Sequence, residues 1–135
     1  MTEHFPLPAP LRAAIIAHAL RESPRECCGV LSGREGVPLR HHETRNVAPG
    51  NRLYEIDPQQ LIDLEFRELP AHDEEIVAIY HSHPASPAFP SATDLDLAFW
   101  PEAVYLICSL AEGDEPVLRG FRLRDGIASE LPLET

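Results

Sequence analysis

Two histidines separated by one residue, His81 and His83, are the side chains in this 135-residue chain best spaced to share a metal ion. Successive side chains of a β-strand point to opposite faces, so residues two apart lie on the same face. The apolar run 76–80 just before them is typical of a central strand that is covered on both sides. We therefore expect two imidazoles side by side where this strand ends. Imidazole nitrogens are common ligands of zinc.

A third ligand has to come from another segment, and Asp94 is the nearest carboxylate after a loop that contains Pro84, Pro87 and Pro90. Two histidines and one aspartate would leave a fourth position for water, as in catalytic zinc sites. Iron or cobalt could also occupy such a ligand set. Ser91-x-x-Asp94 is equally typical of a capping box at the start of a helix. The residues alone leave both interpretations open.

Other metal chemistries fit the sequence less well. Amidohydrolase-type barrels also begin their metal site with H-x-H, but a barrel needs about 250 residues. The H-x-E and P-C-x-x-C signature of base deaminases is absent. His41 and His42 are adjacent on a predicted strand and should point to opposite faces, so one metal is not expected to bind both.

Hydrophobic periodicity and turn residues predict the elements that carry these side chains. Helices are expected over 11–22, from 58 until Pro70, and after Asp94 as far as Trp100, and strands over 27–32, 39–47, 76–80, 103–110, 117–123 and 127–131. In the first helix the pattern places Leu20 with the apolar face and His18 on the opposite one. In the second, Ile62, Phe66 and Leu69 should share a face. This mixture predicts a single α/β (α+β) layered domain.

Composition limits the partners and the compartment. The formal net charge of −11 opposes binding to duplex DNA or to anionic membranes. No apolar run approaches the roughly 20 residues that span a bilayer, and the N-terminal segment does not resemble a signal peptide. Three cysteines, Cys27, Cys28 and Cys108, make a poor disulfide framework and are expected to be buried thiols. We therefore expect a cytoplasmic protein.

The spacing His81-x-His83, seven residues, Ser91-x-x-Asp94 resembles the JAMM motif of the JAMM/MPN zinc metallopeptidases. The segment P-R-E-C-C-G-V-L-S-G at 24–33 is similar to the first-strand segment of the small prokaryotic branch, in which a glutamate precedes Cys-Gly. The resemblance covers nearly the whole chain. It implies one JAMM/MPN domain over residues 1–135, with a curved mixed sheet flanked by two to three helices in a cytidine-deaminase-like arrangement.

The resemblance also implies a role for each matched residue. His81, His83 and Asp94 would bind zinc, and the family spacing favours Asp94 over Asp96 as the third ligand. Ser91 would donate its hydroxyl to the oxyanion, and Glu26 would act as the general base toward the attacking water. Glu26 comes from the resemblance alone, because nothing else in the sequence separates it from the other 21 of the 22 acidic residues.

Members of the family hydrolyse peptide or isopeptide bonds after the C-terminal Gly-Gly of ubiquitin-fold proteins. For this chain the resemblance implies a sulfur carrier or its cysteine adduct as substrate, because there is no room for the insertions that select ubiquitin linkages. The tail of such a substrate could add as a strand to a sheet edge. The alternatives are a noncatalytic MPN-type scaffold for protein interactions and a purely structural metal. The sequence does not determine the oligomeric state, and a homodimer is one possibility.

Overall fold

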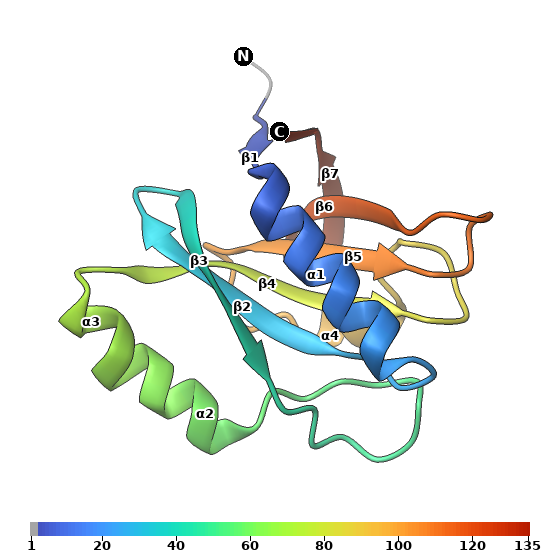
Figure 1. Cartoon of the computed structure of the whole chain (residues 1–135), viewed down its shortest axis with the longest axis horizontal. Coiled ribbons are helices and arrows are strands. Elements are labelled where there is room, and N and C mark those ends of the chain that lie inside the picture. The colour runs from blue at the N-terminus through green and yellow to red at the C-terminus, as the bar shows by residue number, and fades with distance from the viewer. Residues whose placement is uncertain (1–2) are drawn as a thin grey trace.

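A computed structural model of the chain describes residues 3–135 (Figure 1). Its centre is a six-stranded sheet with the order β3-β2-β4-β5-β6-β7. These strands are β2 (Cys28–Arg34), β3 (Val37–Thr44), β4 (Glu75–His83), β5 (Val104–Ser109), β6 (Val117–Arg124) and β7 (Ile127–Leu131). Within this sheet β4 and β5 pair in parallel and the other neighbours are antiparallel, so the sheet is mixed, as predicted. The short strands β1 (Phe5–Pro6) and β8 (Leu133–Glu134) pair with each other.

Strand β4 is the central element that the apolar run predicted. Its residues from Val77 to His83 are all buried. Ala78 and Tyr80 contribute to the core on one face of the sheet, and Ile79 contributes to the core on the other. The strand continues past the apolar run and includes both histidines, as the period of two predicted, with His81 paired to Cys28 of β2 and to Ile107 of β5. Both histidines therefore belong to a central strand of the sheet.

Helix α1 (Ala9–Glu22) covers one face of the sheet (Figure 1). Ile15 and Ala19 are buried in the core on that face. The expected orientation of two side chains was wrong: His18 is buried, whereas Leu20 is 57% exposed. The hydroxyl of the buried Tyr80 explains this, because it forms a hydrogen bond of 2.6 Å with Nδ1 of His18 and so satisfies a polar group that burial would otherwise penalise.

The opposite face is covered by a continuous helical segment made of α2 (Pro58–Asp63), the π-helical turn η1 (Leu64–Glu68) and α3 (Leu69–Ala71). Leu64 and Leu69 are buried against the sheet, but Ile62 and Phe66 are exposed, which corrects the predicted face. A π-turn contains an extra residue, so it rotates the side chains that follow relative to a regular helix. The segment ends at Ala71, one residue after Pro70, so its end lies close to the predicted one.

Helix α4 (Ala92–Asp96) is shorter than predicted and ends before Trp100. Pro101 follows Trp100, and a residue before proline is disfavoured in the helical conformation. Within residues 3–135, no helix is long and apolar enough to cross a membrane.

Gly29 provides a test of the packing around Tyr80. The two residues are paired between β2 and β4, and a Cβ atom at Gly29 would lie 2.3 Å from Cε2 of Tyr80. Gly29→Ala should therefore lower the free energy of unfolding by about 1–3 kcal/mol, the usual cost of overpacking a core. Chemical denaturation measures this. In a Tyr80→Ala background the same substitution should cost clearly less, and equal costs in the two backgrounds would contradict the contact.

Candidate metal centre

His81, His83 and Asp94 converge on one point at the end of β4. The Nε2 atoms of the two histidines are 3.1 Å apart, and Oδ2 of Asp94 lies 3.3 Å from His81 Nε2 and 3.2 Å from His83 Nε2. A tetrahedral zinc with bonds of about 2.0–2.1 Å places its ligand atoms about 3.3 Å apart. The three side chains therefore have the spacing of a zinc ligand set. Asp96, the competing carboxylate, is exposed.

Hydrogen bonds outside this triangle hold two of its members in place. Nδ1 of His83 bonds to the carbonyl oxygen of Pro87 at 2.7 Å, which leaves Nε2 to face the other two side chains. Oδ2 of Asp94 accepts the backbone N–H of Ser91, and Oγ of Ser91 accepts the backbone N–H of Asp94. The capping box is present, and its aspartate is the carboxylate of the triangle. The two interpretations of Ser91-x-x-Asp94 are therefore compatible.

The charges of the triangle suit a cation. Although burial opposes its ionisation, hydrogen bonds from His81 and His83 hold the pKa of Asp94 well below its usual range. Burial lowers the pKa of His81 and favours the neutral imidazole that binds metals. Burial also disfavours the charged form of His83, but its hydrogen bond to Asp94 leaves the pKa of this histidine raised. A metal ion would compete with that proton for Nε2.

Glu26, two residues before the start of β2, also lies close to this group. One of its carboxylate oxygens lies within 4.8 Å of a nitrogen of His81 and of His83. Burial raises the pKa of Glu26 to about 7, with Asp94 adding to the rise and His83 opposing it. Among residues 3–135, Oε1 of this buried carboxyl has no hydrogen-bond partner. A carboxyl with these properties next to a metal-binding triangle is suited to proton transfer.

Tyr54 was not singled out from the sequence, yet it packs directly against the site. Its ring stacks on the imidazole of His81 with centroids 4.2 Å apart and an angle of 18° between the planes. The contact covers one face of a side chain that is itself fully buried. Tyr54 sits in an extended segment, and only the folded loop reveals that this segment returns to the end of β4.

Asn46 holds that loop in position. Its Nδ2 donates to the carbonyl oxygens of Glu26 and Leu53 at 2.9 and 3.0 Å. Its Oδ1 accepts from the backbone N–H groups of Ala48 and Glu55 at 2.9 and 3.0 Å. One side chain thus ties the backbone of Glu26 to the loop that carries Tyr54. In the sequence Asn46 looks like an ordinary turn residue, because its partners are backbone groups that no motif records.

An apolar groove of about 510 Å³ is lined in part by Tyr54, the residue that stacks on His81. Tyr54 and Ile79 line its inner wall, and both are close to His81 in space or along β4. Its lining also includes Leu97, Phe99 and Trp100. Trp100 is half-buried and contributes to the groove.

The remaining candidates have structural environments. Cys27 and Cys28 are buried and free, and burial raises the pKa of their thiols to about 12 and about 11, so both stay protonated. His41 bonds to the hydroxyl of Tyr80, whereas His42 bonds to Oγ of Ser32. The adjacent histidines thus point to opposite faces, as predicted.

Comparison with known proteins agrees with this geometry. The family model described as prokaryotic homologs of the JAB domain matches residues 8–124. A protein of Mycobacterium tuberculosis named CysO-cysteine peptidase is 39% identical over 127 residues, covering 93% of this chain and 86% of the relative. A desampylase of Haloferax volcanii is 39% identical over 110 residues, covering 76% and 78%. The solution structure of a Desulfitobacterium hafniense protein superposes with a TM-score of 0.85, at 32% identity, covering 96% of this chain and 90% of the other.

The fold and these matches define a hydrolase of the JAMM/MPN class. The chain belongs to the family of prokaryotic homologs of the JAB domain, which is the small prokaryotic branch that the sequence motif indicated.

Removing the side chain of Asn46 should loosen the site. Asn46→Ala would leave two backbone carbonyls and two backbone N–H groups without their partner, which should cost about 1–3 kcal/mol of stability. Asn46→Asp keeps an acceptor for the two N–H groups but places a carboxyl oxygen against the two carbonyl oxygens, so it should also lower the stability. Thermal or chemical denaturation of both variants tests this. Equal stability of Asn46→Ala and the wild type would contradict the role of Asn46.

Proposed function

We propose that this chain is a zinc-dependent peptidase that cleaves the bond after the C-terminal Gly-Gly of a ubiquitin-fold protein, such as a sulfur carrier or its cysteine adduct. The observation that carries the proposal is the triangle of His81, His83 and Asp94, with ligand atoms 3.1 to 3.3 Å apart and the buried Glu26 carboxyl beside it. When bound, zinc supplies a Lewis acid that polarises the scissile carbonyl and makes hydroxide accessible near neutral pH.

Glu26 takes the proton of the attacking water and returns it to the leaving nitrogen. Its burial supports this role, because a pKa of about 7 allows the carboxyl to accept and release a proton near neutrality. Its backbone is tethered by Asn46, which limits the movement of the segment that carries it.

Ser91 stabilises the oxyanion that forms on the scissile carbonyl. Its Oγ already accepts the N–H of Asp94, but that bond uses a lone pair and leaves the hydroxyl hydrogen to be donated. The same bond fixes Ser91 beside Asp94 at the helix start. A preorganised donor of this kind stabilises the charge that develops in the transition state.

The apolar groove beside Tyr54 supports an extended tail as substrate. It is lined by Leu53, Leu97 and Phe99, all exposed, and by Tyr54, whose ring stacks on His81. The edge strands of the six-stranded sheet, β3 and β7, are not the strands that carry the metal ligands. We therefore place the tail in this groove. The names of the relatives, CysO-cysteine peptidase and desampylase, agree with a small ubiquitin-like conjugate as the substrate class.

The remaining assignments follow from this function. We propose that residues 1–135 act as one catalytic domain in a reducing compartment such as the cytoplasm, which three free, buried cysteines support. A noncatalytic scaffold is the less favoured alternative, because a scaffold has no use for a buried, unpartnered carboxyl beside three converging ligands.

Glu26→Gln separates proton transfer from metal binding. The substitution keeps the size of the side chain and removes the base, so hydrolysis should fall by about 10²–10⁴-fold while zinc content is unchanged. The assay incubates the protein with a ubiquitin-fold carrier that bears a C-terminal extension, and mass spectrometry identifies the products. Full activity of Glu26→Gln would rule out Glu26 as the base.

Ser91 can be tested without losing the helix cap. Ser91→Thr keeps a hydroxyl and should retain most of the activity. Ser91→Gly removes the donor while costing only a few tenths of a kcal/mol as a cap, yet kcat should fall about 10²–10³-fold. If both variants lose the same activity, or Ser91→Gly loses none, the hydroxyl is not the oxyanion donor.

Zinc removal distinguishes the enzyme from the alternatives. Treatment with a chelator should abolish cleavage of the carrier, and added zinc should restore it. A chain that binds zinc but never cleaves a ubiquitin-fold tail would support a scaffold. If chelation unfolds the chain, the metal is structural. A catalytic zinc can be removed with loss of cleavage while the chain stays folded.

A further inference from the structure

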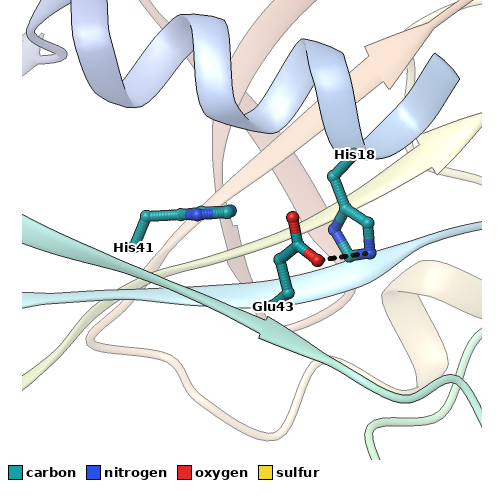
Figure 2. A group of neighbouring side chains, drawn as sticks. All are labelled: His18, His41 and Glu43. Atoms are coloured by element: carbon teal, nitrogen blue, oxygen red, sulfur yellow. Dashed lines mark ion pairs between the residues drawn. The ribbon is translucent and has the colours of Figure 1, made fainter. Parts of the chain in front are cut away.

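A second group of potential ligands lies on the α1 side of the sheet, away from the candidate metal centre. His18 belongs to α1, whereas His41 and Glu43 are two residues apart on β3 and share a face (Figure 2). One ligand atom from each of the three side chains lies within 4.8 Å of the other two. His18 is buried, His41 is half-buried, and Glu43 is exposed, so the group is open to solvent on one side.

The hydroxyl of Tyr80 orients both imidazoles of this group. It lies 2.6 Å from Nδ1 of His18 and 2.8 Å from Nε2 of His41. The hydroxyl oxygen can accept an N–H from each ring, which would leave the second nitrogen of each ring free for a metal. Nε2 of His18 is left facing Oε1 of Glu43 at 3.9 Å, as the dashed line in Figure 2 marks. Outer hydrogen bonds that fix ring orientation in this way are typical of metal-binding histidines.

The protonation states also suit a cation. Burial lowers the pKa of His18 and of His41, so both rings are neutral near pH 7. The hydrogen bond from Arg21 lowers the pKa of Glu43, which is therefore a carboxylate. Neutral imidazoles and an ionised carboxylate are the forms that coordinate divalent metals.

We propose that His18, His41 and Glu43 form a second binding site for zinc or a similar divalent transition metal. Two nitrogens and one oxygen are a ligand set for zinc, and nickel or copper also accept it. Nε2 of His18 and Oε1 of Glu43 are 3.9 Å apart, more than the roughly 3.3 Å between the ligand atoms of a tetrahedral zinc, so the site closes when it binds. The exposed Glu43 side chain can make that movement. The bound ion clamps the last turns of α1 onto β3.

Arg21 is the competitor at this site. Its guanidinium pairs with Oε1 of Glu43, and the two side chains are 53% and 44% exposed. Exposed ion pairs of this kind contribute little stability, so a metal can displace the guanidinium or use the second carboxylate oxygen. Removing Arg21 should therefore strengthen metal binding. A hydrogen-bond network with no capacity for metal predicts no such effect.

The site is independent of the candidate catalytic centre. His81 and His83 alternate with Tyr80 along β4 and face the other side of the sheet. Each site can therefore be emptied by substitution without touching the ligands of the other.

Zinc stoichiometry tests the proposal on the full-length chain. The protein is stripped with a chelator and equilibrated with buffered free zinc alone, and the bound zinc is counted by elemental analysis. We expect two zinc ions per wild-type chain and one in Glu43→Gln. Glu22→Gln is the matched control, since it removes the same charge from the end of α1 but no ligand, and should keep two. Arg21→Ala should lower the dissociation constant of the second zinc about fivefold.

Asp94→Asn shows which of the two ions is lost. It should retain the zinc at His18, His41 and Glu43 and lose the other one. A single zinc that is lost in Asp94→Asn but kept in Glu43→Gln would overturn the second site, as would two zinc ions in Glu43→Gln or weaker binding in Arg21→Ala. A single zinc that is lost in Glu43→Gln and kept in Asp94→Asn would support the second site and contradict the catalytic one. His41→Ala, which leaves the buried His18 in place, should repeat the result of Glu43→Gln.

Discussion

The burial of two imidazoles on one face of β4 is the constraint on which the rest of the site depends. His81 and His83 are taken out of water by the neighbouring strands β2 and β5 and by Tyr54. Polar groups in such a place need partners, because an unpaired buried polar group costs free energy. Asp94 provides a partner for both rings at once. Asp94 thus gathers ligand atoms at the distances that zinc requires, whereas Nδ1 of His81 has no hydrogen-bond partner among residues 3–135.

The loop from β4 to α4 makes this gathering stable. Pro87 supplies the carbonyl oxygen that orients His83, and Ser91 anchors Asp94 through a reciprocal pair of hydrogen bonds. Helix α4 is only five residues long, so it cannot gain much stability from its own backbone. Its position is set instead by this cap and by the packing of Leu95 against the sheet. The main role of this short helix is to hold the carboxylate of Asp94 in position.

The sequence predicted those features that depend on local patterns. The apolar run before His81 identified the central strand, the period of two placed both histidines on one face, and the mixed α/β fold was confirmed. Features that depend on contacts distant in sequence were missed. His18 turned inward because Tyr80, 62 residues later, offered it a hydrogen bond. The prediction of the buried face of the second helix was wrong, because the sequence pattern does not reveal the π-turn at Leu64–Glu68.

Two neighbouring residues of β4 point to polar groups on opposite faces of the sheet. Tyr80 faces His18 of α1, and His81 faces Asp94. Because side chains alternate along a strand, a slip of one residue in the pairing of β4 would exchange the two sides and disable both. The register of the β2–β4 ladder shifts between Leu31 and Ser32, where β4 has the extra residue Val77, and this irregularity lies toward the end of the ladder away from the histidines. The chain can therefore absorb a misfit at that end of the β2–β4 ladder while the paired residues next to His81 keep their alignment. Insertions near the irregularity should be better tolerated during evolution than insertions between Cys28 and Leu31.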